Sequence, residues 1–152
     1  MLYARHLAAP VLLLAIALAG CTTAPQQQPT SASAKLQTEV PTLKVTVDCG
    51  GCTVRSDIPL RIVANYNIAA SKAGVKVSPD KVAYAAIKSY SERNDGARFL
   101  AGAFAGKDEI KLSLTTPDNR HLEVEDYFRN AFQGMDDLLE SIGTRVLLAM
   151  RQ

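Results

Sequence analysis

Apolar and polar positions alternate in three short segments of the chain, at residues 43–48, 109–115 and 121–126. Alternation of this kind predicts β-strands that bury one face. Residues 81–92 form a further, mostly apolar segment after a Ser-Pro-Asp turn composition, and we expect another strand there. Residues 116–120 also have the composition of a turn, so they should join the last two strands in a hairpin.

Two other segments fit a helical spacing better. From residue 135 to residue 150, apolar residues recur every three or four positions, and two aspartates in the first turn favour the helix dipole. Residues 58–73 also alternate as a strand would. However, Pro59 lies where a first helical turn tolerates proline, and Gly74 follows as a stop signal. We therefore expect a second helix at residues 58–73.

The resulting order, β-α-β-β-β-α, predicts an α+β fold in which a small mixed sheet carries both helices on one face. A chain of 152 residues has the length of one domain. Its 17 basic and 15 acidic residues nearly balance, so the charge does not indicate binding to nucleic acid.

The N-terminus has the layout of a secretory signal peptide. Arg5 precedes an uncharged apolar run that is shorter than the roughly 20 residues of a membrane span. The run closes with Leu-Ala-Gly-Cys, which resembles the lipobox of bacterial lipoproteins. In that family the cysteine, here Cys21, is acylated and becomes the first residue of the mature chain. Thr22 follows in place of aspartate, which by the same resemblance favours the outer membrane, facing the periplasm.

The segment after the lipobox, residues 22–42, is rich in Pro, Gln, Ser and Thr and holds few large apolar residues. Such a composition cannot bury a core, so we expect a flexible tether. The chain would then consist of a signal peptide (1–20), a lipidated Cys21 with its tether (21–42) and one periplasmic domain (43–152).

The element order behind a lipobox, together with the phrase ERNDGARFLAGAFAG at residues 92–106, resembles an uncharacterised family of envelope lipoprotein domains. That family is similar in fold to the N-terminal domain of TolB, the curli-secretion channel lipoprotein and the lipoprotein activators of penicillin-binding proteins. The resemblance implies a non-enzymatic domain that docks onto a machine for secretion, conjugation, surface appendages or peptidoglycan synthesis. The implied partners are a protein of that machine and outer-membrane lipid, held through Cys21, and a homo-oligomer is compatible with it.

The same phrase places an apolar stretch beside a cation, at Arg98, Phe99, Leu100 and Phe104. One interpretation is a protruding loop that binds a partner, because an exposed apolar patch usually marks an interaction. The other is that the phenylalanines turn into the core while the glycines bend the chain. The sequence leaves both open.

Cys49 and Cys52 form a CxxC pair, and an oxidising compartment favours a disulfide between them. The alternative is a redox site, which would make the protein a tethered thiol–disulfide oxidoreductase. Against it, the expected helix begins too far beyond Cys52 for its dipole to lower a thiol pKa, and Asp48 would raise that pKa. A metal site would have only His121 to add to the two thiols. We therefore favour a structural disulfide, with no metal and no cofactor. The CxxC pair is not a feature of the resembled family.

The remaining polar residues do not suggest a catalytic set. His121 is the only histidine of the mature chain and should be exposed beside a turn. Arg93 should lie in a solvated loop and Asp108 at a solvated strand position. We therefore expect a protein without enzymatic activity.

Overall fold

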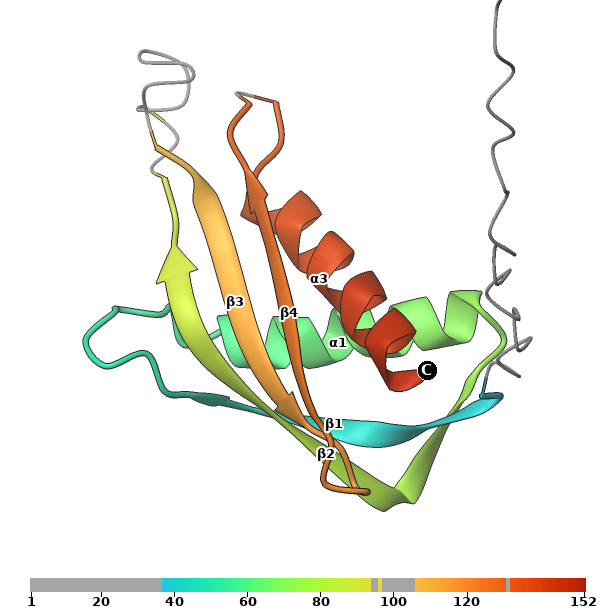
Figure 1. Ribbon diagram of the computed structural model, residues 1–152. Helices are drawn as coiled ribbons and strands as arrows, with labels where there is room; N and C mark the ends of the chain where they lie inside the picture. The colour runs from blue at the N-terminus through green and yellow to red at the C-terminus, as the bar shows by residue number, and fades with distance from the viewer. Residues whose placement is uncertain (1–36, 94–95, 97–105, 131) are drawn as a thin grey trace, which may run out of the picture. The chain divides into compact units, whose positions relative to one another are not determined.

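The computed structural model describes residues 37–93, 96, 106–130 and 132–152 (Figure 1). Their elements are β1 (Glu39–Val47), α1 (Ile58–Lys72), β2 (Lys76–Ser91), β3 (Asp108–Thr115), β4 (His121–Phe128) and α3 (Met135–Met150). This order confirms the predicted α+β fold. Cys21 and the expected signal peptide lie outside the described residues, as does the expected binding stretch of Arg98, Phe99, Leu100 and Phe104. Neither α1 nor α3 is long and apolar enough to cross a membrane.

The four strands form one mixed sheet in the order β1-β2-β3-β4. Strand β1 runs parallel to β2, and the other neighbouring pairs are antiparallel. Along β3, every second residue is buried, and both helices lie on the face that these residues share (Figure 1). Among the described residues, no element covers the other face of the sheet, which we call the open face.

The two helices approach each other closely because Gly143 of α3 has no side chain. A Cβ atom at this position would lie 2.6 Å from the backbone carbonyl carbon of Asn65 and 2.8 Å from the backbone nitrogen of Tyr66. Two ion pairs flank the crossing, Arg61–Asp136 at 2.7 Å and Lys72–Glu140 at 2.9 Å. The hydroxyl of Tyr66, which is fully buried, then donates to the carbonyl oxygen of Pro41 in β1 at 2.7 Å. The crossing therefore also fixes α1 against the sheet.

Strands β1 and β2 begin earlier than their sequence patterns indicate, at Glu39 rather than residue 43 and at Lys76 rather than residue 81. The extra residues pair with each other, from Glu39 with Lys76 to Pro41 with Ser78. The register then shifts so that Thr42 pairs with Val82, and residues 79–81 bulge out of the ladder. The Ser-Pro-Asp composition thus marks a bulge within β2 and not a turn before it.

We expect Gly143→Ala to lower the free energy of unfolding by about 1–3 kcal/mol. Alanine favours a helix over glycine by about 1 kcal/mol, but its methyl group would overlap the backbone of α1. Thr144→Ala, at the exposed neighbouring position, is the matched control and should change stability little. Urea unfolding of both variants measures the difference. A stabilised Gly143→Ala variant would contradict the close crossing.

Candidate interaction site

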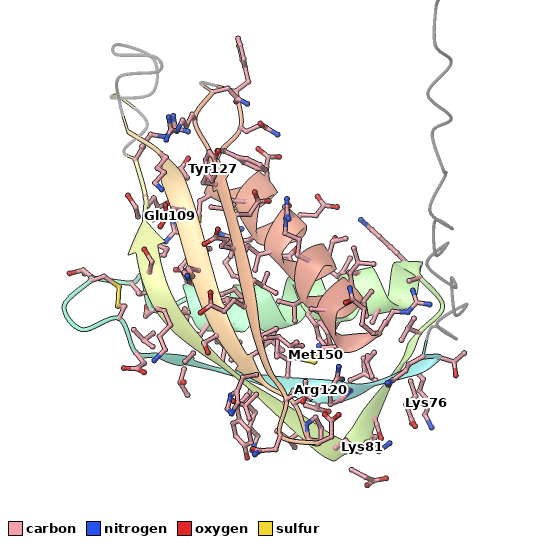
Figure 2. All side chains as sticks on the ribbon, in the orientation of Figure 1. Lys76, Lys81, Glu109, Arg120, Tyr127 and Met150 are labelled. Atoms are coloured by element: carbon pink, nitrogen blue, oxygen red, sulfur yellow. A yellow bond between two sulfur atoms is a disulfide. The ribbon has the colours of Figure 1, made fainter. Side chains whose placement is uncertain are left out.

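Three connections leave the strands at the same end of the sheet, which we call the loop end. They are residues 48–57 after β1, the connection between β2 and β3, and residues 129–134 after β4. At the opposite end the chain enters β1 and the turn at 116–120 joins β3 to β4. We call this the tether end. Figure 2 shows Tyr127 and Glu109 toward the loop end and Lys81 and Arg120 at the tether end.

A buried ion pair closes the base of the connection between β2 and β3. The side chains of Arg93 and Asp108 are 2% and 0% exposed, and Arg93 Nη2 lies 2.9 Å from Asp108 Oδ2. The backbone N–H of Arg93 donates to Asp108 Oδ1 at 2.7 Å. The expectation that both residues are solvated was therefore wrong. The ends of two paired strands bring the opposite charges together, and this pairing makes burial of each charge possible.

The same guanidinium fixes the loop between β4 and α3. Arg93 Nη1 donates to the carbonyl oxygen of Arg129 at 2.9 Å, and Nη2 donates to that of Asn130 at 3.1 Å. From the other side, Asn130 Oδ1 accepts the backbone N–H groups of Phe132 at 3.1 Å and Gln133 at 2.7 Å. Carbonyl groups of Arg129 and Asn130 and N–H groups of Phe132 and Gln133 are thus all hydrogen-bonded.

Phe132, in the connection between β4 and α3, is 94% exposed. Five residues earlier in the chain, Tyr127 of β4 is 53% exposed. Lys107 Nζ and Arg129 Cζ lie 5.3 and 5.4 Å from the centre of the Tyr127 ring, within the range of cation–π contacts. We call Tyr127, Lys107 and Arg129 the aromatic patch, and Phe132 follows in the next connection. Sequence reasoning missed both, although a single phenylalanine in a polar loop between two elements was visible.

Glu109 offsets part of the positive charge of the aromatic patch. Its carboxylate pairs with Lys107 and accepts a hydrogen bond from Ser89 at 2.9 Å. These contacts, that with Lys107 first, lower the pKa of Glu109. Arg129 adds a second cation beside the ring of Tyr127. The patch therefore suits a partner surface that is apolar at its centre and acidic at its rim.

The first connection of the loop end holds the expected disulfide between Cys49 and Cys52, whose Cα atoms are 5.6 Å apart. Helix α1 begins at Ile58, so neither sulfur lies in its first turn. Arg55 ties the connection to β2 through Glu92 at 2.7 Å and also pairs with Asp57 at 3.0 Å. The hydrogen bond from Arg55 lowers the pKa of Asp57. The disulfide and Arg55 thus restrain one short connection together.

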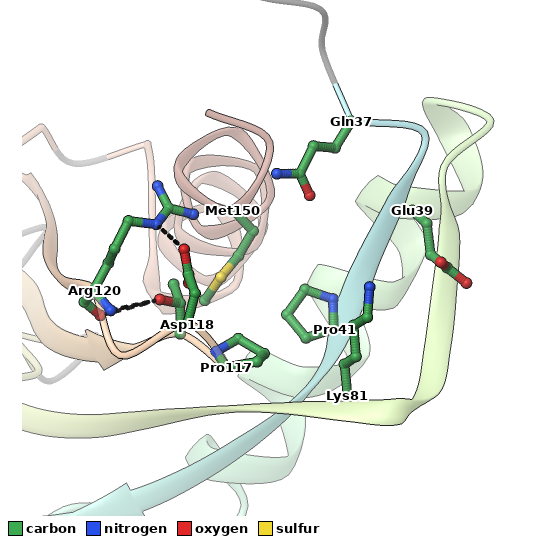
Figure 3. Close-up of a pocket in the computed structure, with 9 residues that line it drawn as sticks. Gln37, Glu39, Pro41, Lys81, Pro117, Asp118, Arg120 and Met150 are labelled. Atoms are coloured by element: carbon green, nitrogen blue, oxygen red, sulfur yellow. Dashed lines mark hydrogen bonds and ion pairs between the residues drawn. The ribbon is translucent and has the colours of Figure 1, made fainter.

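The tether end contains a cavity of about 360 Å³ (Figure 3). Pro41, Pro117 and Met150 form its apolar walls, and Lys81 and Arg120 lie at its rim. Arg120 pairs with Asp118 at 2.7 Å, and hydrogen bonds from Thr116 first and then Arg120 lower the pKa of Asp118. The carboxylate of Asp118 at this cavity is therefore already paired with a cation of the same turn.

His121 starts β4 next to this turn and is exposed, as expected. Its Nδ1 atom lies 3.4 Å from Thr115 Oγ1. Within the part of the chain that the structure describes, no three His, Cys, Asp or Glu side chains come together as metal ligands would.

We expect Arg93→Met to lower the free energy of unfolding by about 3–5 kcal/mol, because it removes one member of a buried ion pair together with its hydrogen bonds to Asp108, Arg129 and Asn130. Arg55→Met is the matched control and should cost at most about 1 kcal/mol, since its ion pairs are exposed. Chemical denaturation measures both. Equal costs for the two variants would show that burial of the pair does not matter.

We expect the double change Cys49→Ser and Cys52→Ser to cost about 2 kcal/mol, because the disulfide closes a very short loop. A structural disulfide should also stay intact when the folded protein is held in a glutathione buffer at about −200 mV. Thiol labelling followed by mass spectrometry measures the reduced fraction. Ready reduction of the folded protein would instead support the redox interpretation.

Comparisons with known proteins show the fold. A scan of protein-family models and a search of curated proteins found no match. Among solved structures, the chain is similar to the PelC dodecamer from Paraburkholderia phytofirmans, with 9% identity and a TM-score of 0.50 over 76% of this chain and 90% of that chain. A minor lipoprotein from Acinetobacter baumannii matches with 8% identity and a TM-score of 0.37 over 76% of this chain and 92% of that chain. The similarity to PelC shows that this α+β arrangement also occurs in a solved protein.

Proposed function

We propose that this protein is a lipid-anchored, non-enzymatic lipoprotein of the outer membrane that docks onto a protein component of an envelope machine. Acylated Cys21 is the anchor. The loop end is the docking surface, formed by Phe132 together with Arg98, Phe99, Leu100 and Phe104 of the connection between β2 and β3. The machine belongs to secretion or conjugation, surface appendages or peptidoglycan synthesis.

The exposure of Phe132 is the observation that carries the proposal. A phenylalanine that is 94% exposed gains nothing from the core of its own domain. Arg93 binds the carbonyl of Asn130, and Asn130 Oδ1 accepts the N–H of Phe132, so the described backbone on either side of the ring is hydrogen-bonded. An exposed aromatic side chain next to such contacts is suited to act as an anchor residue of an interface.

The point at which the chain enters the domain favours a protein, rather than the membrane surface, as the binding partner of the loop end. The described chain enters at Gln37, where its N–H donates to the carbonyl oxygen of Arg151 at 3.5 Å and its own carbonyl accepts from Arg151 Nε at 3.2 Å. Gln37 also lines the cavity at the tether end. The segment that leads from Cys21 therefore joins the domain at the tether end, which would leave the loop end to face the periplasm.

A homo-oligomer is part of the proposal. The PelC structure that shares this fold is a dodecamer. Copies anchored in one membrane are also concentrated there, which favours contacts among them.

We expect Phe132→Ser to weaken capture of the partner at least about 30-fold, as for removal of an interface anchor. The test is affinity purification of the full, C-terminally tagged chain from crosslinked envelopes, with partners identified by mass spectrometry. Ile68→Ser removes an exposed apolar side chain from α1 and is the matched control. The pair Phe99→Ser and Phe104→Ser should also reduce capture. Undiminished capture by the Phe132→Ser variant would contradict the proposed surface.

A further inference from the structure

We propose that copies of this chain join side by side, with β4 of one copy pairing in parallel with β1 of the next. The inference deepens the proposed self-assembly by naming its interface, and it does not depend on the partner that binds the loop end. It rests on the two strands that form the edges of the sheet, β1 and β4.

Along the free edge of β1, one part has backbone groups available for pairing with another strand and the other part does not. The bonds from Asp48 N–H to Ile87 O and from Lys76 N–H to Thr38 O direct the even-numbered residues of β1 toward β2. Successive residues of a strand alternate, so the backbone groups of Leu43, Val45 and Val47 point to the free edge. The edge is closed at Pro41, which has no N–H and whose carbonyl accepts the Tyr66 hydroxyl. Residues 43–47 are left for pairing.

Strand β4 has a matching open segment. Thr116 N–H bonds to Arg120 O at the turn, and the pairing of β3 with β4 continues without a register shift from there. Alternation then turns the backbone groups of Glu123 and Glu125 away from β3, toward the free edge. Farther along, the N–H of Tyr127 already donates to Asp126 Oδ1 at 2.9 Å. The open segment of β4 is therefore about as long as that of β1.

The side chains decide the direction of pairing. In an antiparallel pair, residues with edge-facing backbone groups lie opposite each other, which would bring Glu123 against Leu43 or Val45. In a parallel pair they alternate, so Glu123 lies beside Lys44 and bonds to Leu43 and Val45 of the next copy. Glu125 then lies beside Thr46. Only the parallel pairing keeps polar residues on the open face and both pairs of helices on the other face.

The charges of the two edges complement each other. The carboxylates of Glu123 and Glu125 are 69% and 70% exposed and share one cation, Lys111, at 3.0 and 3.8 Å. Lys44 is exposed on β1 and makes no ion pair within the described residues. In the parallel pairing it would supply the second cation, so that Lys111, Glu123 and Lys44 of the next copy alternate in charge across three strands.

The helix-facing side offers apolar contact. A groove of about 360 Å³ runs between β4 and α3, and Val124, Leu148 and Ala149 are among its lining residues. Leu148 is 50% exposed there. On the opposite side of the domain, Val47 of β1 is 48% exposed. In the proposed register Val45 of the next copy lies beside Val124, at this groove, and Val47 lies one step farther along β4, beside Asp126.

The parallel pairing lets all copies of the assembly keep the same orientation. Strands β1 and β4 of one copy run in the same direction, since β1 is parallel to β2 and two antiparallel steps lead from β2 to β4. Successive copies can therefore keep one orientation, with every tether end on the membrane side and every loop end on the other. A head-to-tail contact of this kind closes into a ring when its rotation permits.

Cysteine crosslinking of the full chain in its own membrane tests the interface. In the proposed register Thr46 and Glu125 of the next copy occupy neighbouring strands about 5 Å apart, within reach of a disulfide. We expect the variant with both Thr46→Cys and Glu125→Cys to form a ladder of dimers, trimers and larger species under oxidation. Each single variant should form none. The pair Thr46→Cys and Ser113→Cys is the matched control, because Ser113 lies on the open face one strand farther in.

Charge variants of the ladder-forming protein check the register. Lys44→Glu should lower the association constant of each contact about tenfold, because it turns attraction into repulsion. Adding Glu123→Lys should restore the ladder. Phe132→Ser should leave it unchanged. A missing ladder would overturn the edge pairing. If an amine-reactive crosslinker still joins copies, the proposed homo-oligomer would stand and only this interface would be wrong. If both methods find a monomer, the edge pairing and the proposed homo-oligomer would both be overturned.

Discussion

The guanidinium of Arg93 lies where three segments of the chain meet, and the loop end depends on how its charge is satisfied. Its charge is balanced by Asp108, at the start of β3, while its remaining donors bind carbonyl oxygens of the loop after β4. A buried cation that lost any of these partners would be costly, so the three segments are held in one arrangement. The same contacts flank Phe132, whose side chain is exposed.

The sheet separates the surfaces on which the proposed function rests. The chain enters at Gln37 at one end, and the aromatic patch with Phe132 lies at the other. The free edges of β1 and β4 lie along the sides. Anchoring, docking and self-assembly would then use different parts of one small domain and need not compete. The disulfide between Cys49 and Cys52 fits this account as a restraint on the loop end rather than as a reactive group.

The sequence predicted the elements well where burial alone determines the pattern. The strand β3 alternates strictly, and α3 has a clear apolar stripe. The starts of β1 and β2 were missed because they depend on pairing with each other across a bulge, which no local pattern reports. Arg93 and Asp108 were misjudged for the same reason, since charge alone indicates solvent unless the partner's position is known. Phe132 was overlooked because its exposure is decided by hydrogen bonds of its neighbours.

The most direct test of the docking surface is a photo-crosslinking amino acid placed at position 132 of the full chain in living cells. The same probe at position 118, at the tether end, serves as the comparison. We expect position 132 to yield a defined adduct with one envelope protein other than this chain, and position 118 to yield none. An adduct with phospholipid alone at position 132, or the same protein adduct from position 118, would contradict the proposed docking surface.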